Sequence, residues 1–254
     1  MRILLTNDDG YHAPGLKVLE EIAARFSDDV WVVAPAEEQS GTSRSLTLTR
    51  PLRVRRFGER RFAVAGTPTD AVMMALGEIM ADGKPDLILS GVNRGANLGE
   101  DVFYSGTVSA AMEGALAGIR SVALSQRYAQ HGMGDAVSFD TARAWGERAL
   151  RPLLDLDFAP RTLMNVNFPP VAPDAVQGIR VARQGIRDYG RVRMDKRTDP
   201  RGYDYYWLAL GRMPHTPAHD TDLDAVHDGH IAVTPLHLDL THGASLAMLN
   251  AAYS

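Results

Sequence analysis

The chain has 254 residues, 45% of them hydrophobic, which is enough for one large domain or one domain with an appendage. Its formal net charge of −4 argues against a protein that binds nucleic-acid duplexes, because such proteins present a strongly basic face. The absence of cysteine excludes disulfides, thiolate metal sites and cysteine nucleophiles. No apolar run approaches the ~20 residues that cross a bilayer, so we expect a cytoplasmic protein that does not act at a membrane.

The first apolar run, Ile3-Leu4-Leu5, ends on Asn7-Asp8-Asp9-Gly10. Such a run suits a strand buried on both faces, and open α/β sheets place their ligands at the carboxyl ends of these strands. Two adjacent carboxylates repel each other, and hard cations such as Mg²⁺ and Mn²⁺ prefer oxygen ligands. The segment therefore predicts either a divalent-cation site or a solvated turn, since Asn, Asp and Gly are also common turn residues.

Strand and helix signals alternate through the first half of the chain. The order of strands and helices favours a mostly parallel sheet with right-handed crossovers. Buried strands are predicted at 30–34, 85–90 and 121–125, and less regular β-like stretches at 46–56 and 61–65. Helices are predicted at 14–26, from a start at 67–70 through 71–80, at 107–117 and at 139–153.

The pattern changes after about residue 160. The remaining signals predict a strand at 163–169, hairpins or an excursion at 178–215, short helices at 222–230 and 240–250, and a terminal strand at 231–235. We therefore expect a core of residues 1–160 that carries the metal site and a C-terminal extension of residues 161–254, or a single domain overall.

Three polar loops follow predicted core strands, at 7–12, 35–45 and 91–107, and a doubly wound sheet gathers them at one edge. Ser40 and Asn93 can each offer one oxygen to a cation held by the two aspartates. A cap or turn role is the commoner one for each of these residues.

The segment Tyr104-Ser105-Gly106-Thr107 leads into the small-residue helix. The first N–H groups of a helix have no partner within the helix, and its dipole favours an anion, so a phosphate is a candidate ligand here. An ordinary Ser/Thr cap is the alternative. Gly41 and Asn97 can supply further donors to phosphate oxygens.

The ordered set of motifs resembles the survival protein E (SurE) family and spans nearly the whole chain. The motifs are Leu-Leu-Thr-Asn-Asp-Asp-Gly at 4–10, Pro-x-x-x-x-Ser-Gly at 35–41, Gly-Thr-Pro-Thr-Asp at 66–70, Ser-Gly-Val-Asn-x-Gly-x-Asn at 90–97, Tyr-Ser-Gly-Thr-Val at 104–108, Asn165-Val-Asn-x-Pro169, Tyr205-Tyr-Trp-Leu208, Thr221-Asp222 and Thr234-Pro-Leu-x-x-Asp-Leu-Thr241. The resemblance implies a Rossmann-like, three-layer α/β/α core. It also implies a nucleotidase that hydrolyses nucleoside 5′- and 3′-monophosphates with one divalent cation per subunit.

The family's metal ligands match Asp8, Asp9, Ser40 and Asn93 of this chain. The resemblance further implies a C-terminal extension that is exchanged between the subunits of a homodimer or homotetramer.

The expected mechanism is metal-assisted attack of water on the phosphomonoester, with Asp8 or Asp9 as the proton acceptor. Three alternatives compete with it. A phospho-accepting signalling domain needs an acceptor aspartate after the third strand, where this chain has Ser90-Gly-Val-Asn93. A phosphatase with a covalent aspartate nucleophile needs Asp-x-Asp, whereas Asp8 and Asp9 are adjacent. A non-catalytic nucleotide-binding module is compatible with the same sequence.

Overall fold

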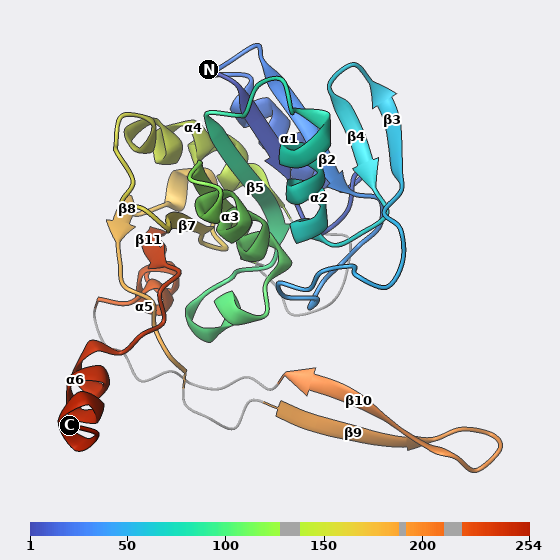
Figure 1. Cartoon of the computed structure of the whole chain (residues 1–254), viewed down its shortest axis with the longest axis vertical. Helices are drawn as coiled ribbons and strands as arrows, with labels where there is room; N and C mark the ends of the chain where they lie inside the picture. Colours follow the sequence, from blue (N-terminus) through green and yellow to red (C-terminus); the bar gives the residue numbers. More distant parts are fainter. Residues whose placement is uncertain (128–137, 188–191, 211–219) are drawn as a thin grey trace.

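The computed structural model describes residues 1–127, 138–187, 192–210 and 220–254 (Figure 1). Parts of the predicted 178–215 excursion, at 188–191 and 211–215, lie outside the described residues. Within the described part of the chain, nine strands form one sheet in the order β3-β4-β2-β1-β5-β6-β7-β11-β8. The strands are β1 (Ile3–Thr6), β2 (Val30–Pro35), β3 (Val54–Gly58), β4 (Arg61–Val64), β5 (Leu87–Arg94), β6 (Arg120–Gln126), β7 (Thr162–Phe168), β8 (Ile179–Val181) and β11 (Ile231–His237).

The sheet is mostly parallel, as the alternating strand and helix signals predicted. The β3–β4 and β7–β11 pairs are antiparallel, and the other neighbouring pairs are parallel. Strands from both sides of residue 160 share this sheet, so the proposed boundary near 160 runs through one sheet and does not separate two.

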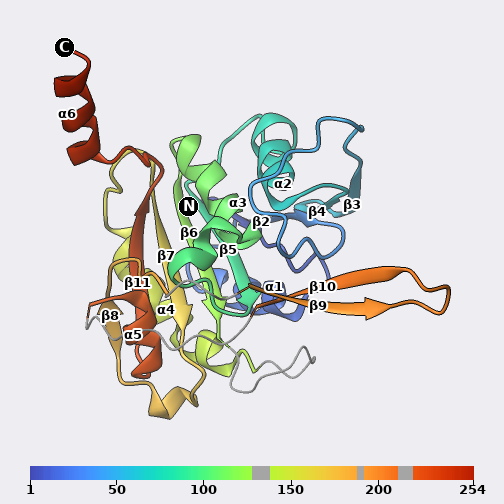
Figure 2. The ribbon, with the colours of Figure 1, turned by 90° about the horizontal axis from the view of Figure 1, so that it is seen from below.

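Helices cover both faces of the sheet, giving three layers (Figures 1 and 2). Ile3 and Leu5 pack in a core with helices α1 and α4, whereas Leu4 packs in a core with α2 on the opposite face. This alternation explains why β1 is an uninterrupted apolar run. The helices are α1 (Pro14–Ala23), α2 (Pro68–Met74), α3 (Gly106–Leu116), α4 (Asp140–Leu154), α5 (Asp222–His227) and α6 (Gly243–Ala252); a π-helical segment (Ala75–Ile79) continues α2, and 3-10 turns lie at Gly99–Phe103 and Pro173–Ala175.

The predicted β-like stretch at 46–56 is wrong over most of its length. The structure begins strand β3 only at Val54. Before it, the amide of Thr47 donates to the Asp70 carboxylate over 3.1 Å, so a side chain takes the place of a strand partner. The same carboxylate accepts from the Thr67 amide over 2.8 Å and caps α2.

Two C-terminal elements lie away from the body of the molecule. The antiparallel hairpin of β9 (Val192–Thr198) and β10 (Asp204–Leu210) projects outward, and α6 stands apart from the sheet (Figures 1 and 2). No residue of α6 is buried. None of the described helices is both long and apolar enough to cross a membrane.

Candidate functional site

The two adjacent aspartates lie at the carboxyl end of β1 and contact different parts of the fold. Asp8 is 4% exposed and accepts a hydrogen bond from the Thr107 hydroxyl at the start of α3. Asp9 accepts from the Arg94 amide at the end of β5, over 2.9 Å. The amide of Gln39 donates to the main-chain carbonyl of Asp8 over 2.8 Å. The aspartate pair therefore joins three segments that are distant in sequence.

Gly106 allows α3 to approach Asp8 closely. A Cβ atom at this position would lie 2.8 Å from the Cβ of Asp8 and 3.0 Å from its Oδ2. A side chain at 106 would therefore displace the Asp8 carboxylate or the first turn of α3.

Burial is the largest influence on both carboxyl groups. It raises the pKa of Asp8 to about 7; the neighbouring Asp9 charge acts in the same direction, and the Thr107 hydroxyl opposes it. Burial also raises the pKa of Asp9, against the opposing effect of the Arg94 amide and guanidinium. The protein therefore holds two carboxyl groups where their ionised forms are poorly stabilised, and a cation bound between them would favour ionisation.

The other two predicted ligands lie in segments that meet the aspartates, Asn93 near the end of β5 and Ser40 in the loop after β2. Asn93 precedes Arg94 on β5, and its amide group donates to the Gly95 carbonyl over 2.9 Å. Ser40 follows Gln39, and its hydroxyl donates to the Glu38 carboxylate over 2.9 Å. The structure thus brings the segments of all four predicted ligands to one edge of the sheet.

The chemistry of the donor set fits a hard divalent cation. Among the described residues, no group of three or more His, Cys, Asp or Glu side chains gathers in a metal-binding arrangement, so a metal here needs neutral oxygens as well as the aspartates. Asn7, the residue before Asp8, is 1% exposed, and its side-chain Oδ1 has no hydrogen-bond partner in the described structure. An oxygen-rich, incompletely satisfied site of this kind matches Mg²⁺ or Mn²⁺.

The residues predicted to contact phosphate differ in how the fold holds them. Ser105 caps α3 by accepting from the Val108 amide over 3.1 Å, and Gly41 has a φ of +74° in the loop after β2. Asn97 is buried, and its side-chain amide donates to the Ser125 hydroxyl over 2.8 Å. The side chain of Asn97 is thus already committed to the fold.

The network around Asn97 was not identified from the sequence. The backbone amide of Asn97 donates to the side-chain oxygen of Asn167 over 2.8 Å, and the backbone carbonyl of Asn97 accepts from the side chains of both Asn165 and Asn167. Asn165-Val-Asn167 was noted only as part of the family resemblance. These contacts fix the loop between β5 and α3.

Asp222 also supports this loop, a role that was not predicted from the sequence. It is fully buried at the start of α5 and accepts from the amides of Gly99 and Gly185, each over 2.9 Å. Burial raises the pKa of Asp222, and these two amides oppose the shift. The sequence signal was Thr221-Asp222, which alone indicates only a helix start.

Comparison with known proteins gives a consistent result. The family model described as "Survival protein SurE" matches residues 3–191. A protein of Rhizorhabdus wittichii named 5′-nucleotidase SurE is 67% identical over 253 residues, covering 100% of both chains. A protein of Erythrobacter litoralis with the same name is 58% identical and covers 98% of each. The crystal structure of a SurE protein from Aquifex aeolicus superposes with a TM-score of 0.86 at 39% identity, covering 100% of both chains.

Proposed function

The chain belongs to the survival protein SurE family, and from this membership and the buried aspartate pair we infer that it is a 5′-nucleotidase whose chemistry centres on Asp8 and Asp9. Its reaction is hydrolysis of the phosphomonoester of nucleoside monophosphates to nucleoside and phosphate. On the basis of the family resemblance, we propose that nucleoside 3′-monophosphates are substrates as well. The observation that carries the assignment of the site is the pair of adjacent, buried carboxylates joined to α3 and β5.

One divalent cation per subunit, Mg²⁺ or Mn²⁺, is the proposed cofactor. Asp8, Asp9, Ser40 and Asn93 would hold it. When bound, such a cation lowers the pKa of water and neutralises charge on a phosphate.

The chain's own residues supply the remaining steps. Asp8 or Asp9 would accept the proton of the attacking water; burial raises the pKa of both carboxyl groups, which makes each carboxylate a stronger base. The Ser105 hydroxyl and the first amides of α3, at Gly106 and Thr107, would hold the phosphate oxygens together with the Gly41 amide. Asn97 would add only the second N–H of its side-chain amide, because the first is bonded to Ser125. Because α3 has eleven residues, its dipole adds to the attraction for the dianionic ester.

Removal of the metal tests the proposed function. We expect phosphate release from AMP or GMP in the presence of Mn²⁺, and loss of release after treatment with a chelator followed by buffer exchange. Re-addition of Mn²⁺ should restore the rate. Binding of AMP without phosphate release under any metal condition would favour the nucleotide-binding module, and a trapped phosphoaspartate would favour the alternatives that use a covalent aspartate.

The affinity for Mn²⁺ should fall as the pH drops below 7. The pKa of Asp8 is raised from 3.8 to about 7, so below pH 7 a proton competes with the cation. We expect the apparent Kd to rise by about tenfold per pH unit below 7. Calorimetric titration at pH 5.5, 6.5 and 7.5 measures the affinity, and an affinity independent of pH would contradict the raised pKa of Asp8.

The stability of the metal-free protein should also depend on pH. Because the pKa of Asp8 is higher in the folded protein than in the unfolded chain, the metal-free protein should lose stability as the pH rises from about 4 through 7.

The exposed C-terminal elements support a homodimer or homotetramer with exchanged segments. On β10 the side chains of Trp207 and Leu208 are 61% and 62% exposed, and on α6 that of Met248 is 65% exposed. Large apolar groups on a projecting hairpin and on a helix with no buried residue are typical of association surfaces. A second copy of the chain is the proposed occupant of these surfaces.

Trp207→Asp should shift the protein toward the monomer. A charge placed in an apolar contact has to be desolvated, which weakens association. Light scattering coupled to gel filtration measures the mass. Leu156→Asp is the matched control, since Leu156 is 50% exposed, lies after α4 and belongs to neither the hairpin nor α6. A monomeric mass for the unaltered protein at micromolar concentration would refute the proposed exchange.

The proposed location is the cytoplasm. It is supported by the absence of cysteine from a chain of 254 residues, which is compatible with a reducing compartment. Cell fractionation with antibody detection tests this location.

A further inference from the structure

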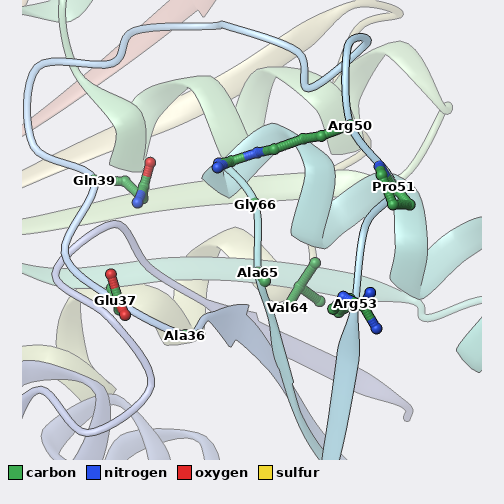
Figure 3. A pocket seen from close by; sticks show the side chains of 9 residues that line it. All are labelled: Ala36, Glu37, Gln39, Arg50, Pro51, Arg53, Val64, Ala65 and Gly66. Carbon is green, nitrogen blue, oxygen red and sulfur yellow. The ribbon is translucent and has the colours of Figure 1, made fainter.

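A cavity of about 430 Å³ opens beside the segment after β2, whose Gln39 amide bonds to the Asp8 carbonyl. Its wall is formed by the segment after β2, the loop before β3 and the end of β4 (Figure 3). The volume lies within the roughly 300–1,000 Å³ that is typical of small-molecule sites. None of the residues so far assigned to the metal or the phosphate lines it.

The cavity lies within reach of a nucleotide whose phosphate meets Asp8. Strands β2 and β1 are neighbours in the sheet, and adjacent strands lie about 4.8 Å apart. Gln39 lines the cavity and donates its amide to the Asp8 carbonyl over 2.8 Å. The backbone of Glu37 also packs on Gly10, where a Cβ would lie 3.1 Å from the Glu37 carbonyl carbon. The segment after β2 therefore joins the cavity wall directly to the segment that carries Asp8 and Asp9.

The charged side chains of the cavity are available to a ligand. Arg50, Arg53 and Glu37 line it, and none of their side chains makes a hydrogen bond or ion pair with another residue that the structure describes. Figure 3 shows Arg50 extending across the cavity toward Gln39. Pro51 and Val64 provide apolar surface beside these groups. The cavity thus combines planar cations, one carboxylate and apolar walls.

We propose that this cavity binds the base of the nucleotide and selects guanine, with Arg50 and Arg53 donating to the base and Glu37 accepting from it. This inference rests on the nucleotidase function proposed above. Guanine presents two acceptors, O6 and N7, and on its other edge the N1 and N2 donors. Arginine pairs with the first edge and a carboxylate with the second. Guanidinium planes also stack on bases.

Other bases fit these groups less well. Adenine carries an N6 amino donor where guanine carries O6, so it would set a donor against the arginines and lose the hydrogen bond that O6 accepts. Pyrimidines fill less of the cavity. A second phosphate would match the arginines, but it would meet the negative charge of Glu37.

The test compares substrates that differ only in the base. We expect kcat/KM for GMP to exceed that for AMP by about tenfold, the discrimination of one good base contact. Arg50→Ala and Glu37→Gln should each bring the GMP-to-AMP ratio close to one. The ratio of GMP to p-nitrophenyl phosphate, an ester without a base, should fall about tenfold in Arg50→Ala. An unchanged ratio in both variants would overturn the inference.

Two further measurements test the base selectivity even if Arg50→Ala or Glu37→Gln fails to fold. Guanosine should inhibit hydrolysis of p-nitrophenyl phosphate by the unaltered protein more strongly than adenosine, and equal inhibition would count against a guanine site. Arg56→Ala is the matched control, because Arg56 lies on β3, bonds to the Gly58 carbonyl over 2.9 Å and does not line the cavity. If the unaltered protein hydrolyses neither GMP nor p-nitrophenyl phosphate, the proposed function fails. Hydrolysis of both without preference for GMP would refute the base selectivity alone.

Discussion

Asp8→Asn is expected to lower kcat for AMP by on the order of a thousandfold. The substitution removes the negative charge that would hold the cation or accept the proton of the attacking water. It keeps the shape of the side chain, and an asparagine oxygen can still accept the hydrogen bond from the Thr107 hydroxyl. Steady-state kinetics with saturating Mn²⁺ measures the loss, and calorimetric titration measures the accompanying weakening of Mn²⁺ binding.

The stability of the same variant separates a role at the site from damage to the fold. Burial raises the pKa of Asp8 to about 7, so above that pH the ionised side chain destabilises the metal-free protein. Asp8→Asn should therefore leave the metal-free Tm at pH 8 unchanged or raise it while activity disappears. Asp157→Asn, at an exposed position after α4, should change neither quantity. Full turnover in Asp8→Asn would refute the assigned chemistry.

The core strands could be predicted from the sequence because their burial leaves a local signal. In β1, Ile3 and Leu5 pack on one face and Leu4 on the other, so the residues are apolar without alternation. Parallel topology then places the following loops at one edge. The contact of Asp8 with Thr107, 99 positions away, follows from that topology.

Other contacts of the site leave no periodic signal. The bond from the Asn97 amide to Asn167 spans 70 positions, and that from Gly99 to Asp222 spans 123. Each depends on one polar side chain at the end of an element, a pattern that also describes an ordinary cap or turn residue. The strand predicted over 46–56 failed for a similar reason, because the amide of Thr47 pairs with the Asp70 side chain.

Gly106→Ala is expected to lower kcat by about a hundredfold, the cost of displacing reacting groups by about 1 Å. The new Cβ would lie 2.8 Å from the Asp8 Cβ and 3.0 Å from Pro68 Cγ, so either the carboxylate or the first turn of α3 has to shift. Alanine normally stabilises a helix relative to glycine, which makes the expected loss a consequence of this contact and not of helix propensity. Kinetics with AMP, together with the Kd for Mn²⁺, measures the effect.

Two glycines serve as controls for this variant. Gly77→Ala introduces a Cβ with no atom within 4 Å, so activity and Tm should both be retained. Gly114→Ala lies on the same helix as Gly106, but its Cβ would meet the Ser121 hydroxyl at 2.3 Å, away from the aspartates. We expect Gly114→Ala to lower the Tm while the folded protein keeps its kcat, whereas Gly106→Ala should lose kcat with a smaller change in Tm. If the two variants lose kcat equally, close approach of α3 to Asp8 has no special role in the reaction, and Gly106 serves packing alone.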